Sequence, residues 1–123
     1  MLTLRTRWRQ WNSIGRRGER IAARHLRRCG LRILARNLRI RSIEIDIVAL
    51  DPVRDELVVI EVKTSLGTKD ATQRIDRRKR RRLQIASACL CSSRPVRVEA
   101  IGVNLGPPLR IRRHGAPADQ PGR

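Results

Sequence analysis

The chain has 123 residues, of which 40% are hydrophobic, and a formal net charge of +18 from 29 basic and 11 acidic side chains. This length suits one compact domain, and so large a positive charge favours a polyanionic partner, either nucleic acid or an anionic membrane surface. No stretch approaches the ~18 apolar residues of a membrane span and no secretory segment is recognisable, so we expect a cytoplasmic protein that binds nucleic acid and no membrane.

The N-terminal part of the chain predicts a basic arm followed by an amphipathic helix. Residues 1–12, in which arginines alternate with two tryptophans, are expected to form this arm or a first turn of helix. Ser13 is suited to be the N-cap of the helix, and Gly30 favours its end. Between them, small or apolar residues recur at helical spacing. These positions are Ile14, Gly18, Ile21, Ala22, His25, Leu26 and Cys29.

The middle of the chain predicts three strands. A short strand over 31–40, irregular near Asn37, is followed by a cleanly alternating strand over 43–50. Residues 51–56 favour a turn. Residues 57–64 are apolar on both faces, as is typical of a central strand. The second and third strands are therefore expected to form an antiparallel hairpin.

The remainder of the chain predicts a helix over about 70–90 and two further strands over 96–103 and 109–112. The last residues, 115–123, are expected to form a disordered tail. Together these elements predict an α/β fold, with residues 13–114 as a single domain.

The acidic residues are concentrated in one part of this basic chain. Six of the 11 lie between positions 43 and 62, a window that contains one basic residue, Arg54. The six are Glu44, Asp46, Asp51, Asp55, Glu56 and Glu61. The three in the predicted turn are explained as solvated loop residues. The other three lie inside predicted strands and need another cause.

A symmetric hairpin explains these strand carboxylates as a metal site. Partner positions would sum to 107, so Asp46 would face Glu61 and Glu44 would face Lys63, all on one face of the sheet. Directly opposed carboxylates repel each other, and a divalent cation would compensate. Oxygen ligands in a chain with two histidines and no CxxC pair favour Mg²⁺ or Mn²⁺ over zinc.

We therefore expect Asp46 and Glu61 to bind the metal, which activates water and polarises a phosphoryl oxygen. Lys63, one of three lysines in the chain, is expected to orient the water or stabilise the transition state. The same four strand residues are explained equally well as cross-strand ion pairs on a solvated face of the sheet.

A second basic cluster lies in the helix predicted over 70–90. Helical spacing places Lys79 in the apolar stripe, and five arginines surround it. Arg78, Arg81 and Arg82 are expected to bind phosphate groups together with Lys79. Alternatively, Lys79 snorkels past the core to solvent.

These motifs, in this order and spacing, resemble the YraN family, small bacterial proteins of unassigned role in the PD-(D/E)XK nuclease superfamily. The resemblance covers about residues 15–101. It rests on Gly15-Arg-Arg-Gly18-Glu19, Asn37-Leu-Arg39, Glu44-Ile-Asp46, Glu61-Val-Lys63, and Lys79 with Leu83, Ala86 and Leu90.

The resemblance implies a restriction-endonuclease-like fold, with a central mixed sheet flanked by helices. It implies that Asp46 is the metal-binding aspartate and that Glu61 and Lys63 are the catalytic E-x-K pair. Glu19 matches a glutamate that related junction-resolving nucleases contribute from the first helix, and is a further candidate catalytic residue. Arg39 is a candidate nucleic-acid-binding residue.

Two positions depart from the family pattern. Ile43 stands where the family usually has glycine, and Ser65 stands where it usually has arginine after the E-x-K motif. Ser65 removes an expected phosphate contact. Neither position is a predicted metal ligand.

Two functions follow from these expectations. The first is a Mg²⁺- or Mn²⁺-dependent endonuclease acting on DNA, with branched DNA as one substrate. The second is a non-catalytic nucleic-acid-binding or accessory protein that retains the nuclease fold. DNA is favoured over RNA as the partner, although attraction to phosphate alone does not distinguish them. The sequence does not determine the oligomeric state.

Overall fold

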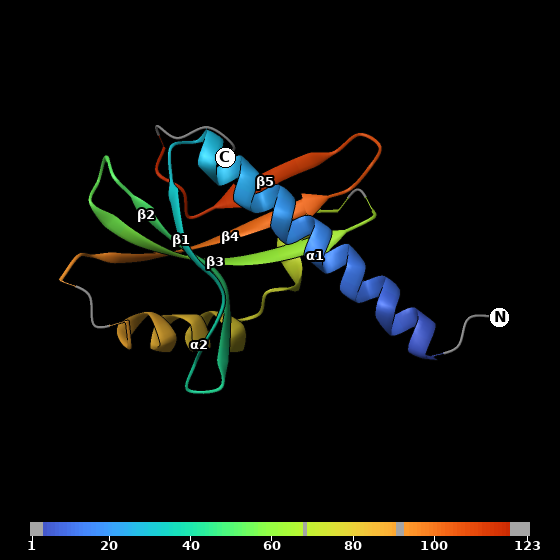
Figure 1. Cartoon of the computed structure of the whole chain (residues 1–123), viewed down its shortest axis with the longest axis horizontal. Coiled ribbons are helices and arrows are strands. Elements are labelled where there is room, and N and C mark those ends of the chain that lie inside the picture. The colour runs from blue at the N-terminus through green and yellow to red at the C-terminus, as the bar shows by residue number, and fades with distance from the viewer. Residues whose placement is uncertain (1–3, 68, 91–92, 119–123) are drawn as a thin grey trace.

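The computed structural model describes residues 4–67, 69–90 and 93–118, with side chains from residue 13 onward. Its five strands form one sheet in the order β1-β2-β3-β4-β5. Strands β3 and β4 are parallel, and all other neighbours are antiparallel. The elements are α1 (Leu4–Arg28), β1 (Arg32–Ile40), β2 (Ile43–Asp51), β3 (Glu56–Ser65), the 3₁₀ helix η1 (Ala71–Arg74), α2 (Arg77–Ala88), β4 (Val96–Asn104) and β5 (Arg110–His114). The expected α/β fold with a mixed sheet and flanking helices is confirmed (Figure 1).

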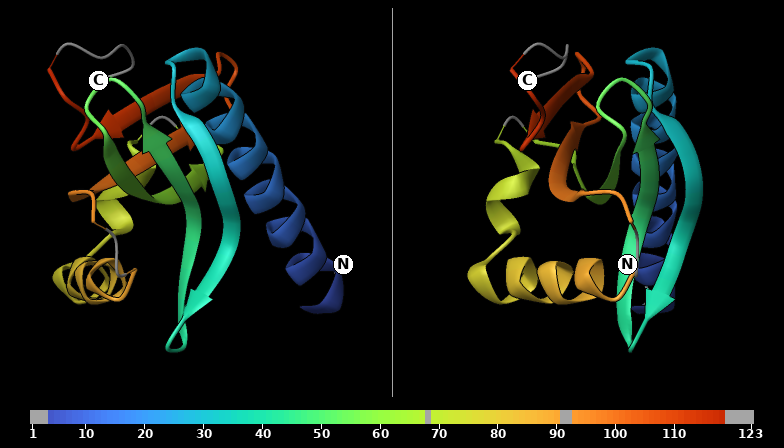
Figure 2. Two further views of the ribbon diagram at one scale, coloured as in Figure 1. Left: turned by 60° about the vertical axis from the view of Figure 1, so that its left-hand side comes forward. Right: turned by 90° about the vertical axis from the view of Figure 1, so that its left-hand side faces the viewer.

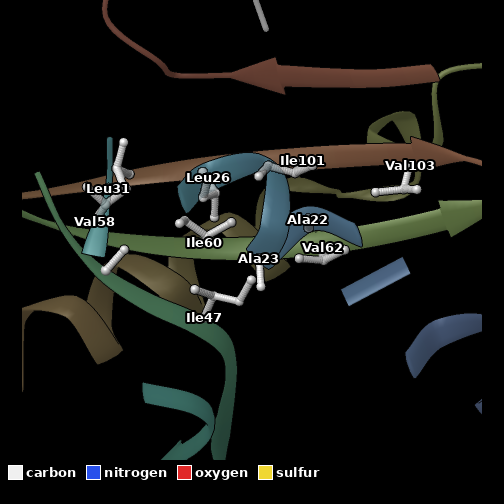
Figure 3. Close-up of a cluster of buried hydrophobic side chains, with 11 residues drawn as sticks. Ala22, Ala23, Leu26, Leu31, Ile47, Val58, Ile60, Val62, Ile101 and Val103 are labelled. Atoms are coloured by element: carbon white, nitrogen blue, oxygen red, sulfur yellow. The ribbon is translucent and has the colours of Figure 1, made fainter. Parts of the chain in front are cut away.

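The two α-helices cover opposite faces of the sheet (Figure 2). On one face, Ala22 and Leu26 of α1 belong to a cluster with Val58, Ile60 and Val62 of β3 (Figure 3). Parallel strands need a crossover connection, and here η1 and α2 supply it between β3 and β4.

The second cluster lies under α2, where Leu83 and Ala86 pack with Ile45 and Val59. Because β3 contributes alternate residues to both clusters, it is apolar on both faces, as its sequence predicts. Neither described α-helix has the combination of length and apolar composition that is needed to cross a bilayer.

Helix α1 begins earlier than its sequence pattern predicts. It starts at Leu4, so Ser13 lies inside the helix and the prediction that it is the N-cap is wrong. Residues 4–12 contain neither Gly nor Pro and include three arginines, which favour helix, so nothing in the sequence interrupts it. The rest of the expected basic arm, residues 1–3, lies outside the described residues.

The prediction of a single helix over 70–90 is also wrong, because the segment forms two helices with separate caps. Asp70 accepts a hydrogen bond from the Thr72 backbone N–H and begins η1. Asp76 accepts from the Lys79 backbone N–H at 2.9 Å and begins α2. Aspartate favours such capping geometry over a helix interior. At the C-terminus, residues 119–123 of the expected disordered tail lie outside the described residues.

Gly18 sets the distance between α1 and β3. A Cβ atom at this position would overlap the Thr64 side chain, whereas one at Gly15 would meet nothing within 4 Å. We expect Gly18→Ala to lower the free energy of unfolding by about 1–3 kcal/mol through overpacking. Gly15→Ala is expected to raise it by about 0.5–1 kcal/mol through helix propensity. Urea denaturation of both variants measures this, and stabilisation by both would contradict the close approach of α1 to β3.

Candidate active site

Strands β2 and β3 separate where the predicted site lies (Figure 1). Their ladder has the predicted register but ends at the pair Ile47 and Ile60. The predicted pairing of Asp46 with Glu61 is therefore not formed. Instead, Asp46 Oδ2 accepts a hydrogen bond of 2.7 Å from the backbone N–H of Val62. The Asp46 side chain thus supplies an acceptor to β3 at the point where the ladder stops.

The separation coincides with a change in how β2 packs. Side chains two apart on a regular strand point to the same face. Here Ile45 packs in the cluster beneath α2, while Ile47 packs in the cluster beneath α1. The regular alternation is therefore broken at Asp46, which lies between them.

Glu61 is the most buried member of the site, with only 3% of its surface exposed. Its Oε1 atom lies 3.3 Å from Lys63 Nζ and 3.6 Å from Lys79 Nζ. Its Oε2 atom is buried and has no hydrogen-bond partner among the described residues. The expected pair of Glu44 and Lys63 is not formed, because the Lys63 ammonium contacts Glu61.

The position of Lys79 was only partly predicted. Its helical spacing allowed either phosphate binding or snorkelling to solvent. The structure directs the ammonium towards Glu61 and leaves the side chain 31% exposed. Helix α2 thus contributes a second cation to the E-x-K pair of β3.

The carboxylates of the site are electrostatically coupled. Burial, followed by the negative charge of Glu61, raises the pKa of Asp46 to about 7, against the opposing effect of the hydrogen bond from Val62. Burial also raises the pKa of Glu19, helped by the charges of Glu44 and Glu61 and opposed by Arg36. Helix α1 therefore brings Glu19 into the same electrostatic environment as Asp46 and Glu61.

Glu19 and Asp46 also line one pocket, with a volume of ≈610 Å³, between α1 and the β1–β2 hairpin. Its other lining residues are Gly15, Arg16, Arg20, Arg36, Asn37 and Glu44. The sequence did not identify the three arginines as site residues. Arg16 and Arg20 lie within three positions of Glu19 in the sequence, and this proximity could have identified them. Arg36 belongs to β1 and has no such signal in the sequence.

The donor set suits a hard divalent cation. Asp46 and Glu61 offer carboxylate oxygens, and Glu61 Oε2 is a buried acceptor without a partner in the described chain. In the part of the chain that the structure describes, no group of three or more His, Cys, Asp or Glu side chains is placed to coordinate a metal ion. Mg²⁺ is commonly bound by one or two carboxylates together with waters and substrate phosphates, so the pair of carboxylates fits such an ion.

The other predicted nucleic-acid-binding residues lie on the surface. Arg78, Arg81 and Arg82 are exposed on α2, the helix that also carries Lys79. Arg39 is exposed on β1, where its ladder partner is Glu44 of β2. None of these arginines is buried, and none lines the pocket that Glu19 and Asp46 share.

The raised pKa of Asp46 predicts a pH-dependent stability. In the unfolded chain an aspartate stays ionised between about pH 8 and pH 6, whereas folded Asp46 takes up a proton near pH 7. Stability should therefore rise as the pH falls through this range, by about 1.4 kcal/mol. Urea denaturation without metal measures it. In Asp46→Asn this contribution should vanish, and an unchanged pH dependence in the variant would contradict the assignment.

Two of the three acidic residues of the predicted turn, Asp51 and Glu56, are not solvated loop residues, so that explanation is wrong for them; it holds for Asp55, whose side chain is 74% exposed. Asp51 is 1% exposed, and its Oδ2 lies 2.9 Å from Arg97 Nη1. The same nitrogen lies 3.0 Å from Glu56 Oε2, and Arg97 also bonds Glu99. Glu99 in turn holds Arg113 at 2.8 Å. The available signal was the charged pair at positions 97 and 99 inside the predicted strand.

Comparison with known proteins places this site in a family. The profile of the uncharacterised protein family UPF0102 matches residues 18–103. The chain is similar to a UPF0102 protein of Mycobacterium avium, with 37% identity over 100 residues that cover 76% of this chain and 78% of that protein. A UPF0102 protein of Symbiobacterium thermophilum is 40% identical over 106 residues, covering 80% and 88%. One of Mycobacterium bovis is 38% identical over 114 residues, covering 87% and 88%. The chain therefore belongs to the uncharacterised protein family UPF0102, the YraN family.

Proposed function

We propose that this protein is a Mg²⁺- or Mn²⁺-dependent endonuclease that acts on DNA, with Asp46 and Glu61 as the metal ligands. The observation that supports it best is the state of the Glu61 carboxylate. One oxygen faces two ammonium groups, while the other is buried without a hydrogen-bond partner in the described chain. A buried acceptor left open is costly, and a cation would satisfy it.

The residues of the site divide the work of phosphodiester hydrolysis. A bound divalent cation supplies a Lewis acid and lowers the pKa of water. Asp46 and Glu61 would hold the cation, because the carboxylate of Asp46 is fixed by Val62 and that of Glu61 is buried in the sheet. The Lys63 ammonium is partly exposed beside Glu61, where it can donate to a phosphate oxygen or to the attacking water. Glu19, in the pocket it shares with Asp46, can accept a hydrogen bond from that water.

The charge of the chain supports nucleic acid as the substrate class. A net charge of +18 attracts a polyanion from any direction. The exposed Arg78, Arg81 and Arg82 extend this attraction along α2, next to the helix face from which Lys79 reaches Glu61. Together they would hold the phosphate backbone across the site.

One observation favours a second function. Lys63 and Lys79 together neutralise Glu61 without any metal. A protein that binds nucleic acid without cutting it could use this arrangement as a structural ion-pair cluster. The accessory function is therefore the alternative to hydrolysis.

Incubation of the purified protein with linear, single-stranded and four-way-junction DNA, and with single-stranded RNA, tests the proposal. Each substrate is incubated with Mn²⁺, with Mg²⁺ or with EDTA, alongside Asp46→Asn as a matched control. We expect cleavage of DNA that requires metal and is lost in the variant. Cleavage that persists in the variant would indicate a contaminating nuclease. Binding without cleavage on every substrate would support the accessory function instead.

A further inference from the structure

A second pocket, of ≈490 Å³, lies at the C-terminal end of β3 beside the candidate active site. Alternate residues of a strand share a face and lie roughly 6.6 Å apart. Ser65, which lines this pocket, therefore continues the row that begins with Glu61 and Lys63. The pocket is one such step beyond the predicted catalytic lysine. Lys69, Asp70 and Arg74 also line this pocket.

The wall of this pocket is fixed by Asn104, at the end of β4. Asn104 is 4% exposed. Its Nδ2 atom lies 2.9 Å from Ser65 Oγ, 2.6 Å from the Gly67 carbonyl oxygen and 2.7 Å from the Lys69 carbonyl oxygen, so its two N–H groups are shared among three acceptors. A buried amide thus links Ser65, Gly67 and Lys69 to the end of β4.

Arg74 is placed in the pocket by the short helix η1 and by a hydrogen bond to the backbone of β3. Its Nη2 atom donates to the carbonyl oxygen of Thr64, the residue that follows Lys63. Its side chain is exposed, and no carboxylate of the described residues forms an ion pair with it. A guanidinium has five N–H donors, so most of them remain available to a ligand.

Asp70, an acidic residue that lines the same pocket, does not form an ion pair with Arg74. Asp70 Oδ1 accepts hydrogen bonds from the Thr72 backbone at 3.0 Å and from Thr72 Oγ1 at 2.7 Å. Asp70 Oδ2 lies 2.6 Å from His114 Nε2. Both oxygens are therefore engaged away from Arg74. A positioned guanidinium without a counter-ion favours an oxyanion ligand, and phosphate matches its planar donors.

We propose that Arg74, with Lys69 and Ser65, binds the backbone phosphate next to the one at Lys63, as a substrate-positioning site. One step along the row of β3 side chains is comparable to the separation of successive phosphates on a nucleic-acid strand. A single strand lying along β3 would therefore present one phosphate to Lys63 and its neighbour to Arg74. The assignment of the first phosphate as the one cleaved rests on the proposed function, whereas binding of the second does not.

Salt-dependent binding in EDTA, where no cleavage occurs, tests this site. Fluorescence anisotropy with a labelled single-stranded DNA would compare wild type with Arg74→Gln and Arg32→Gln. Arg32 is a matched control, because it is exposed and lies on β1 at the end of the sheet away from Ser65. Arg74→Gln is expected to weaken binding about tenfold and to reduce the slope of log K against log salt by about 0.7. Equal effects of both substitutions would overturn the site.

Neutral methylphosphonate linkages, placed at one position of the DNA at a time, locate the contact. For wild type, one internal linkage should weaken binding, and Arg74→Gln should lose its sensitivity at that linkage only. A sensitivity confined to the 5′-terminal phosphate would overturn an internal site. If Arg74→Gln lowers the melting temperature, Arg74→Lys is used instead, which keeps the charge and should preserve the salt slope. If Arg74→Gln loses its sensitivity at one linkage but the protein shows no metal-dependent cleavage, the nuclease proposal alone is contradicted. If the protein cleaves DNA but Arg74→Gln keeps the wild-type sensitivity, this phosphate site alone is contradicted.

Discussion

Replacing Glu61 with glutamine is expected to lower metal-dependent cleavage of DNA about 10³-fold, equivalent to ~4 kcal/mol of activation free energy. Glu61 is 3% exposed, and its Oε2 atom is buried without a hydrogen-bond partner among the described residues, so it is placed to give that oxygen to a metal ion. Glutamine keeps the shape of the side chain but removes the charge that attracts the cation. The lysines that contact Glu61 are each 31% exposed and can be solvated in the variant.

Single-turnover cleavage and the rise in melting temperature with added Mn²⁺ measure this prediction together. Glu44→Gln is the matched control, because Glu44 lines the same pocket as Asp46 but is exposed. We expect the control to retain cleavage to within about tenfold and to retain the stabilisation by Mn²⁺. Equal losses in both variants would show that general negative charge, and not Glu61, is what the reaction needs. Retained stabilisation by Mn²⁺ in Glu61→Gln would contradict its role as a metal ligand.

Replacing Glu99 with alanine is expected to lower the free energy of unfolding by about 3–5 kcal/mol, because it removes a buried carboxylate that binds the buried Arg113 guanidinium. Arg113 is 3% exposed, and both Nε and Nη2 donate to Glu99 at 2.9 Å. Glu99 also accepts from Arg97 Nε at 3.0 Å. Domains of this kind have total stabilities of about 5–15 kcal/mol, so this loss is a large fraction of the whole.

Urea denaturation measures the loss, with Arg94→Ala as a control. Arg94 pairs with Asp55 at 2.7 Å, but both side chains are largely exposed, at 46% and 74%. Exposed pairs contribute about 0–1 kcal/mol, so the control should change stability little. If Glu99→Ala cost no more than this control, the bonds between Glu99 and Arg113 would not be a source of stability.

The parts of this fold that were predictable from the sequence depend on local periodicity. Residues of β3 are apolar on both faces, a pattern that by itself indicates a central position in the sheet. The spacing of Glu61 and Lys63 similarly fixes them on one face of one strand. Such features need no knowledge of distant residues, so they were correctly predicted.

The parts that were not predictable depend on residues far apart in the chain. Asp51 contacts Arg97 across 46 positions, and no local pattern distinguishes such a pair from two solvated charges. The end of the β2–β3 ladder is set by the packing of Ile45 and Ile47 on opposite clusters, which the alternating sequence of β2 does not indicate. Glu19 reached the candidate site through family resemblance, because its position depends on how α1 crosses the sheet.

The hydrogen bond between Asp46 and Val62 affects how relatives of this protein should be interpreted. A side-chain oxygen at position 46 completes the hydrogen bonding of β3 where β2 departs, whether or not a metal binds. A descendant that had lost cleavage would still be selected to keep aspartate or asparagine there, because an unpaired buried N–H costs about 1–3 kcal/mol. Retention of Asp46 in a lineage therefore reports folding as much as chemistry.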